Sequence, residues 1–164
     1  MNQGKGPDIL GLCEVENKPV LDLLLSRLSS LQRNYKVAHH DTKDKRGIDI
    51  AFIYDGNKFT LKGQYFHVVL KRTATRDLFQ VNLKTPSGAL LICIGNHWPS
   101  RRGGEYHTEP YRIIAAETLS YWNERIFEIL GEDVPIIVMG DFNDEPYSRL
   151  WLIRLMRTFP RAIK

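Results

Sequence analysis

The chain has 164 residues, of which 43% are hydrophobic and 26% charged, and this composition is typical of a soluble globular protein with one core. No apolar run approaches the roughly 20 residues that cross a membrane, and the first seven residues lack the apolar stretch of a signal peptide. The net charge of +4 gives little support to nucleic-acid binding, because its excess lies after Ser148, where the chain has five basic residues and no acidic one.

The N-terminal part predicts a buried strand followed by an amphipathic helix. The strand covers residues 8–13 and ends at Glu14, with Glu16 two residues further on. Pro19 opens the helix, and Asn34 is its expected end. The apolar face of this helix comprises Leu21, Leu24, Leu25, Leu28 and Leu31.

The central part predicts strands in hairpin-like succession, which favours antiparallel pairing. A short strand at 35–40 precedes a solvated loop at 41–47. Turn signals at 55–57 and 86–88 separate the later strands. These strands are expected at 48–55, 59–70, 75–85 and 89–95.

The C-terminal part predicts two helices around a buried strand. The first helix covers 110–130, with Thr108 or Glu109 as its cap and Gly131 at its end. The strand covers 135–139 and stops at a polar cluster that begins with Asp141. The second helix is expected at 147–157.

These elements predict an α/β (α+β) fold, a layered α/β sandwich of mixed, largely antiparallel sheets flanked by helices. We expect a single domain over 1–164, in which 148–164 forms a basic tail. The sequence has no glycine-rich phosphate loop. Cys13 and Cys93 lie in separate apolar runs, so we expect two core thiols rather than a disulfide or a metal pair.

Polar side chains follow three of the predicted strands. They are Glu14, the pair Asn96 and His97, and the cluster that contains Asp141 and Asn143. If these ends meet at one edge, the carboxylates suit Mg²⁺ or Mn²⁺, and the set suits metal-assisted phosphoester hydrolysis. The alternative is that they are ordinary turn residues and that His97 is a core histidine.

Three segments resemble the endonuclease/exonuclease/phosphatase family, the Mg²⁺-dependent phosphoesterases related to pancreatic-type deoxyribonuclease. They are the strand at 7–13 with Glu14, the sequence Asn96-His97-Trp98, and the sequence Gly140-Asp141-Phe142-Asn143-Asp144. The resemblance extends over about residues 7 to 147.

The resemblance implies a role for each matching residue. Glu14 would bind Mg²⁺ or Mn²⁺, although Glu16 would take this role in a different strand register. His97 would be a catalytic imidazole, Asp141 would activate the attacking water, and Asn143 would bind the phosphoryl oxygens. Asp144 and Glu145 are expected to be turn residues.

Several further residues are candidates for binding the substrate. Asn96, Arg101 and Arg102 rank first, because they adjoin His97 and because arginine binds phosphate through bidentate hydrogen bonds. Solubilising surface charge is an equal alternative for the arginines. The secondary candidates are Arg46, Asp49 and Arg76.

Two elements of the family have no counterpart in the sequence. A strand that carries an asparagine usually precedes the glutamate strand, and a Ser-Asp-His element usually follows the Gly-Asp-Phe-Asn element. We therefore expect an incomplete domain that is weakly active or inactive by itself. The alternative function is a non-catalytic remnant that binds a metal, a phosphate group or a protein partner.

The substrate class is open among DNA, RNA, phosphoinositides and sphingomyelin, and the family resemblance favours DNA or RNA. The sequence predicts no membrane-spanning segment. It leaves the oligomeric state open. We expect a cytoplasmic protein by default, or a secreted one if the N-terminus is truncated.

Overall fold

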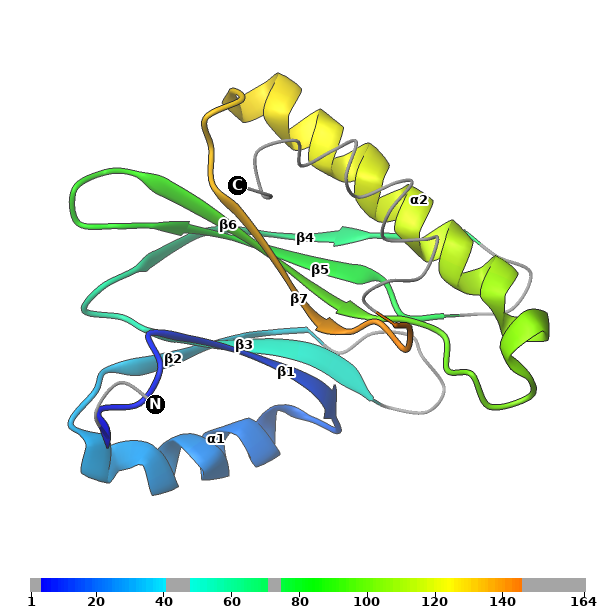
Figure 1. Ribbon diagram of the computed structural model, residues 1–164. Coiled ribbons are helices and arrows are strands. Elements are labelled where there is room, and N and C mark those ends of the chain that lie inside the picture. The colour runs from blue at the N-terminus through cyan, green and yellow to red at the C-terminus, as the bar shows by residue number, and fades with distance from the viewer. Residues whose placement is uncertain (1–3, 41–47, 71–74, 146–164) are drawn as a thin grey trace.

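The computed structural model describes residues 4–40, 48–70 and 75–145, and Figure 1 shows the arrangement of their elements. The first sheet and its helices comprise β1 (Ile9–Val15), α1 (Lys18–Arg27), the 3₁₀ helix η2 (Leu28–Leu31), β2 (Tyr35–His39) and β3 (Asp49–Asp55). The second sheet and its helix comprise β4 (Thr60–His67), β5 (Leu78–Lys84), β6 (Leu90–His97), α2 (Glu105–Leu130) and β7 (Ile136–Asp141).

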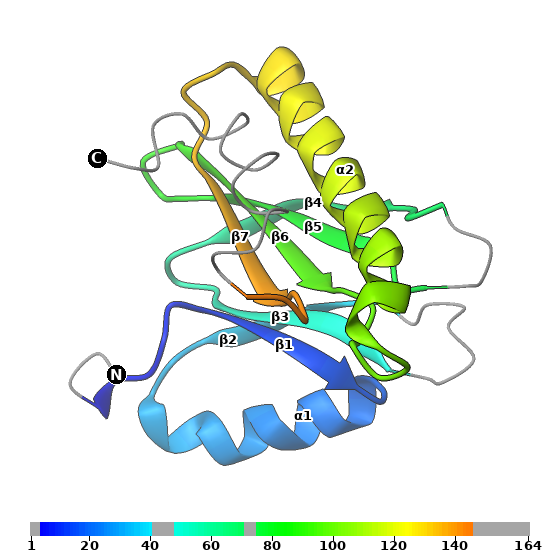
Figure 2. The same cartoon turned by 45° about the vertical axis from the view of Figure 1, so that its right-hand side comes forward.

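Two sheets pack face to face, and each has a helix on its outer face (Figures 1 and 2). The first sheet has the order β1-β3-β2 and the second the order β4-β5-β6-β7. All neighbouring strands are antiparallel except β6 and β7, which are parallel and are connected through α2. The predicted fold class, a sandwich of mixed, largely antiparallel sheets flanked by helices, is confirmed.

Three layers of side chains hold the sandwich together. Between the sheets, the aromatic rings of Phe52 and Phe79 are 5.6 Å apart, and Phe66 stacks on Phe79. Alternate residues of β5 and β6 face outward toward α2, where Leu78 and Ile94 pack against Leu119. The third layer, under α1, is smaller, so burial of apolar surface favours the second sheet and α2 most.

The two helices differ from their predictions in their ends and in their buried faces. The side chain of Asn17 caps α1 by accepting a hydrogen bond from the Val20 amide at 3.1 Å. This helix ends at Arg27 rather than near Asn34 and continues as η2. Leu21 is its only buried residue, and the other leucines of the predicted stripe are half-buried.

Helix α2 begins at Glu105, five residues before the predicted start at Pro110. Gly104 is the N-cap and has no side-chain hydrogen bond, so the prediction of Thr108 or Glu109 as the cap is wrong. Pro110 lies inside the helix, which extends over it at the loss of one backbone hydrogen bond. Gly131 ends the helix as predicted.

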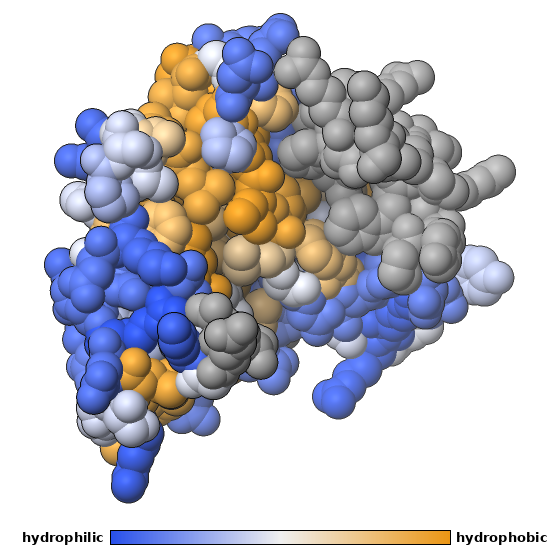
Figure 3. Space-filling model, turned by 60° about the vertical axis from the view of Figure 1, so that its left-hand side comes forward, coloured by the Kyte–Doolittle hydropathy of each residue, from blue (hydrophilic) through white to orange (hydrophobic). Residues whose placement is uncertain are grey.

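The strands β1 and β7 are edge strands, although both were predicted to be buried on both faces. Their apolar side chains are mostly half-buried, and Ile137 is 43% exposed. Figure 3, in which the left-hand side of Figure 1 comes forward, shows an apolar surface on that face of the molecule. A continuous apolar run therefore did not mean a central strand here.

Some predictions fall outside the described residues. These are the loop at 41–47 with Arg46, the helix at 147–157 and the basic tail at 148–164. The single domain over 1–164 stays a prediction. Across the described part of the chain, no helix is both long enough and apolar enough to cross a membrane.

Candidate active site

The parallel pairing of β6 and β7 places His97 beside Asp141. The two residues are register partners, as are Asn96 and Gly140 one position earlier. The Trp98 amide donates a hydrogen bond to the Asp141 carbonyl at 2.8 Å, which extends the pairing past the end of β6. Two of the predicted catalytic residues thus lie next to each other at the same end of the sheet.

Gly140 gives β7 a backbone that only glycine accommodates at this point. Its φ is +136°, and a Cβ atom would lie 2.8 Å from the backbone nitrogen and carbonyl carbon of Asn96, and closer still to the carbonyl oxygen. The glycine therefore lets β7 approach β6 and directs the chain toward Asp141.

Glu14 reaches the same end of the sandwich from the other sheet. The pairing of β1 with β3 shifts register between Leu12 and Val15, and Glu14 adopts a φ of +60° within this irregularity. Its side chain is 68% exposed, and its Oε1 lies 3.8 Å from Nε2 of His97. Cys13 adds a direct link between the sheets, because its thiol donates to the Asn96 carbonyl at 3.3 Å.

His97 is buried at the junction of the two sheets. It lies on the same side of β6 as Cys93, which packs in the core between the sheets. The imidazole is therefore enclosed by protein, with its Nε2 toward the carboxylate of Glu14. The buried imidazole of His97 and the exposed carboxylate of Glu14 thus lie together at the end of the sandwich.

The loop after β7 holds Asp141 and Asn143 in a defined turn. One carboxylate oxygen of Asp141 accepts the Asn143 amide at 2.8 Å, and Asn143 has a φ of +49°. Nδ2 of Asn143 donates to the Trp98 carbonyl at 3.0 Å, which uses one of its two N–H groups. Asp141 itself is exposed at the end of the strand.

The geometry does not support a substrate contact for Asn96, because its side chain is bonded inside the protein. The residue is fully buried. Its Nδ2 donates to the Ile94 carbonyl at 3.1 Å, and its Oδ1 accepts the Trp98 indole N–H at 3.0 Å. Asn96 thus fixes Trp98 and the end of β6.

The two arginines after β6 differ in their surroundings. Arg101 donates through Nε to the Asn143 carbonyl at 3.0 Å and forms ion pairs with Asp144 and two further carboxylates. Arg102 is exposed, and no ion-pair partner is found for it among the described residues. The substrate-binding role of both stays a prediction, and Arg102 has the more accessible charge.

Asp144 and Arg112 form part of the site's structure that the sequence did not indicate. The carboxylate of Asp144 is 5% exposed and pairs with Arg112, whose side chain is 1% exposed in α2. The sequence of this helix predicts a core-facing stripe of Ile113, Ala116, Leu119, Ile126 and Leu130, which leaves out Arg112. The buried face contains Arg112, Ala115, Ala116, Leu119, Asn123 and Ile126.

The secondary candidates Asp49 and Arg76 are both buried. Asp49 lies 3.7 Å from Nε2 of His39, a residue that the sequence had not singled out. Asp49 shares its side of β3 with Ala51, which packs in the cluster under α1 rather than between the sheets. Its register partner on β1 is Val15, so Asp49 belongs to the side of the first sheet that faces α1.

The donors at this site fit a hard, largely hydrated cation. Within residues 4–40, 48–70 and 75–145, no three His, Cys, Asp or Glu side chains surround one position. Mg²⁺ is usually held by one or two carboxylates together with water and substrate phosphate. The exposed carboxylate of Glu14 can supply such a contact.

Comparisons with known proteins are consistent with this geometry. A family model described as "Endonuclease/Exonuclease/phosphatase family" matches residues 1–155. Comparison with curated proteins finds no significant match.

Solved structures share the fold. The catalytic domain of human Nocturnin, solved with a bound sulfate anion, is 26% identical with a TM-score of 0.68 over 89% of this chain and 55% of that chain. Truncated TDP2 from Caenorhabditis elegans is 18% identical with a TM-score of 0.67 over 87% and 52%. ANGEL2, a 2',3'-cyclic phosphatase solved with adenosine-2',3'-vanadate, is 20% identical with a TM-score of 0.64 over 88% and 42%. This chain thus spans about half the length of these proteins or less.

Proposed function

Because the chain belongs to the endonuclease/exonuclease/phosphatase family, we propose that its strand-end site hydrolyses phosphodiester bonds with the help of a divalent metal ion. The observation that carries the proposal is the placement of His97 between Asp141, its register partner on β7, and Glu14, 3.8 Å away on the other sheet. A carboxylate and an imidazole side by side, with a second carboxylate opposite, suit acid–base chemistry at phosphorus.

Each residue has a distinct task in the proposed reaction. Asp141 accepts a proton from the attacking water and orients it, because its carboxylate is exposed and is fixed by the Asn143 amide. His97 donates a hydrogen bond to the phosphate where negative charge develops, and its burial strengthens that interaction. The second N–H of Asn143 and the guanidinium of Arg102 supply further donors for the phosphoryl oxygens.

Glu14 is the residue that would hold the metal ion. Its carboxylate is exposed beside His97 and gives oxygen ligands that Mg²⁺ and Mn²⁺ accept. A bound divalent ion would neutralise negative charge on the phosphate and favour attack by water.

We propose a nucleic acid, DNA or RNA, as the substrate class. The family supports a phosphodiester. The sulfate anion in the Nocturnin catalytic domain has the shape of a phosphate group, which agrees with an anion site in this fold. Phosphoinositides and sphingomyelin are the competing substrates, and the assay below includes them.

The test is hydrolysis by the full chain, with the protein in excess over substrate because weak turnover is expected. Plasmid DNA, a single-stranded RNA and a chromogenic phosphodiester are each incubated with Mg²⁺ or Mn²⁺. Sphingomyelin and a phosphoinositide are assayed in the same way. We expect cleavage that EDTA abolishes and that Asp141→Asn and His97→Ala each lower by about 10²–10⁴-fold.

The matched control is Asp22→Asn, which makes the same chemical change at an exposed residue of α1 that pairs with Lys18. Its activity should equal that of the unmodified chain. Hydrolysis that survives both site substitutions, or that EDTA does not affect, would refute the proposal.

A second candidate is binding of phosphate or metal without turnover. This candidate is favoured because two of the predicted substrate-binding residues bond to the protein itself. The side chain of Asn96 bonds to Ile94 and Trp98. The guanidinium of Arg101 pairs with Asp144 and Glu145. In that case, Mg²⁺ or inorganic phosphate would shift the NMR signals of Glu14 and His97, while no substrate would be cleaved.

A further inference from the structure

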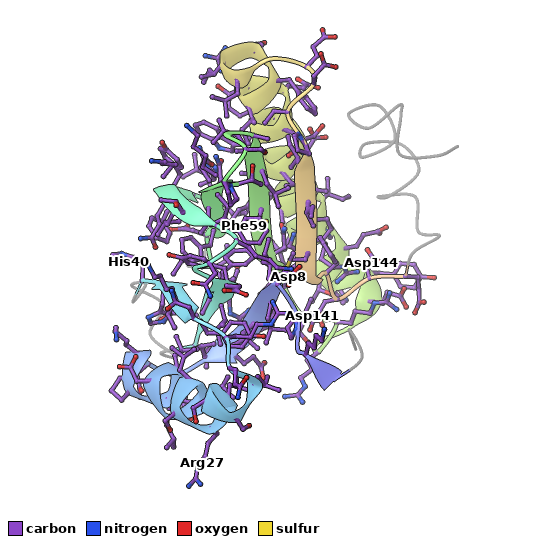
Figure 4. All side chains as sticks on the ribbon, turned by 90° about the vertical axis from the view of Figure 1, so that its left-hand side faces the viewer. Asp8, Arg27, His40, Phe59, Asp141 and Asp144 are labelled. Carbon is purple, nitrogen blue, oxygen red and sulfur yellow. The ribbon has the colours of Figure 1, made fainter. Side chains whose placement is uncertain are left out.

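The carboxylate of Asp144 lies between two guanidinium groups. Its Oδ1 is 3.0 Å from Nη2 of Arg101, and its Oδ2 is 3.3 Å from Nε of Arg112. Figure 4 shows Asp144 just beyond Asp141 at the end of β7. The carboxylate therefore joins the loop after β6, the loop after β7 and helix α2.

Arg112 depends on Asp144 for its charge balance. Its side chain is almost completely buried, and Asp144 is the one carboxylate within ion-pair distance among the described residues. Its other contacts are neutral: Oγ1 of Thr108 at 2.8 Å and the Glu105 carbonyl at 3.4 Å. A buried guanidinium that loses its counter-charge is strongly destabilising, so Asp144 is held firmly in place.

Arg101 holds the same loop from the other side. Its Nε donates to the Asn143 carbonyl at 3.0 Å, while Nη2 reaches Asp144. Nη1 lies 3.3 Å from Glu145 and 3.6 Å from Glu105, both of which are exposed. All three guanidinium nitrogens of Arg101 thus point toward protein acceptors.

We infer that Asp144 is a positioning residue, which keeps Asp141 and Asn143 in their reactive arrangement without contacting the substrate. Asn143 is in the left-handed region at φ +49°, a conformation that asparagine tolerates and that contacts with its neighbours support. It receives that support from Trp98 on one side and from the Arg101 and Asp144 pair on the other. The inference rests on the proposed function for its catalytic consequence, and it gives Arg101 the same positioning task.

The decisive variant is Asp144→Asn, which keeps the shape of the side chain and removes its charge. We expect kcat to fall about 10- to 100-fold, because a small displacement of catalytic groups has an effect of this size. KM should change little, since no substrate contact is lost. Asp144→Glu, which keeps the charge, should regain part of the kcat.

The matched control is Glu145→Gln. Its carboxylate also pairs with Arg101, but it is 71% exposed, so solvent replaces the lost interaction. Its kcat should equal that of the unmodified chain. Equal losses in both variants would overturn the inference, as would an unchanged kcat in Asp144→Asn.

The double variant Asp144→Asn with Arg112→Gln separates positioning from stability. It removes both buried charges, so the Tm should recover toward that of the unmodified chain while kcat stays low. Recovery of both would show that Asp144 acts only through stability and would overturn the inference.

Hydrogen exchange at the Trp98 amide gives a readout that does not depend on turnover. This N–H donates to the Asp141 carbonyl at 2.8 Å and therefore reports the closure of β7 on β6. We expect exchange at least about tenfold faster in Asp144→Asn and unchanged in Glu145→Gln. If the chain hydrolyses no phosphodiester, the proposed function fails, whereas unchanged exchange in Asp144→Asn refutes the positioning role.

Discussion

At the scale of single residues, Gly140 is the position where the site leaves least freedom. We predict that Gly140→Ala lowers the free energy of unfolding for two reasons. Backbone strain alone costs about 1–3 kcal/mol. The loss should exceed this amount, because the new Cβ would also overlap the backbone of Asn96. Urea unfolding measures the loss. Activity should fall with it, since His97 and Asp141 are paired through this segment.

Gly131→Ala is the control for that substitution. Gly131 also has a positive φ, +95°, but a Cβ there would meet no heavy atom within 4 Å. It should therefore lose about 1–3 kcal/mol, from backbone strain alone. Equal losses in the two variants would show that the contact with Asn96 is not limiting.

The environment of His67 disfavours the protonated form of its imidazole. Burial lowers the pKa of His67, and its hydrogen bond with Oε1 of Gln80 at 2.7 Å and the nearby charge of Asp77 offset this in part. The ring also stacks on Trp122, with 4.1 Å between the centroids. The neutral imidazole is thus the form that packs against α2.

The free energy of unfolding should fall as the pH drops below 6.5, the ordinary pKa of His67. Below that pH the unfolded chain takes up a proton that the folded chain binds less readily, whereas above it both states are neutral. We predict that His67→Gln reduces the fall between pH 8 and 5.5, measured by urea unfolding. An equal reduction in His107→Gln, an exposed histidine, would contradict this.

At the scale of secondary structure elements, β1 and β7 each end a sheet within the described part of the chain, and we expect these edges to affect the behaviour of the protein in solution. Neither strand contains a lysine or a proline that would protect its edge. Unpaired backbone groups flanked by apolar side chains favour association with another strand. We therefore expect the protein to self-associate as its concentration rises.

Ile137→Lys should reduce this association, because it puts a charge on the exposed edge of β7. The side chain is 43% exposed, so the Tm should change only slightly. Analytical ultracentrifugation over a range of concentrations measures the effect. Ile129→Lys is the control, since Ile129 is 66% exposed on α2, and a similar reduction there would indicate non-specific charge repulsion.

Much of the element order was predictable, but the element ends were less so. Alternating and continuous apolar runs located every described strand, and Gly131 marked the end of α2. The start of α2 was missed because Pro110 reads as a first-turn residue, whereas the helix begins before it. The edge position of β7 was missed because strand order depends on pairing between distant segments.

At the scale of the whole molecule, the proximity of the candidate site residues was predictable, but the ion pairs that hold their loops were not. The ends of three strands indicated Glu14, His97 and Asp141, and the fold brings them to the same end. The buried pair of Asp144 and Arg112 gave no such signal, because a charged residue in a helix normally lies in solvent. Only the packing of α2 on the second sheet showed where that arginine lies.

The link between Cys13 and Asn96 has a consequence for the order of folding. It joins residues 83 positions apart, whereas β4, β5 and β6 pair with their neighbours along the chain. Contacts of long sequence separation require closure of a large loop, so they form late. The hairpins of the second sheet can therefore assemble before β1 docks, and a nascent chain would acquire most of its secondary structure before Glu14 meets His97.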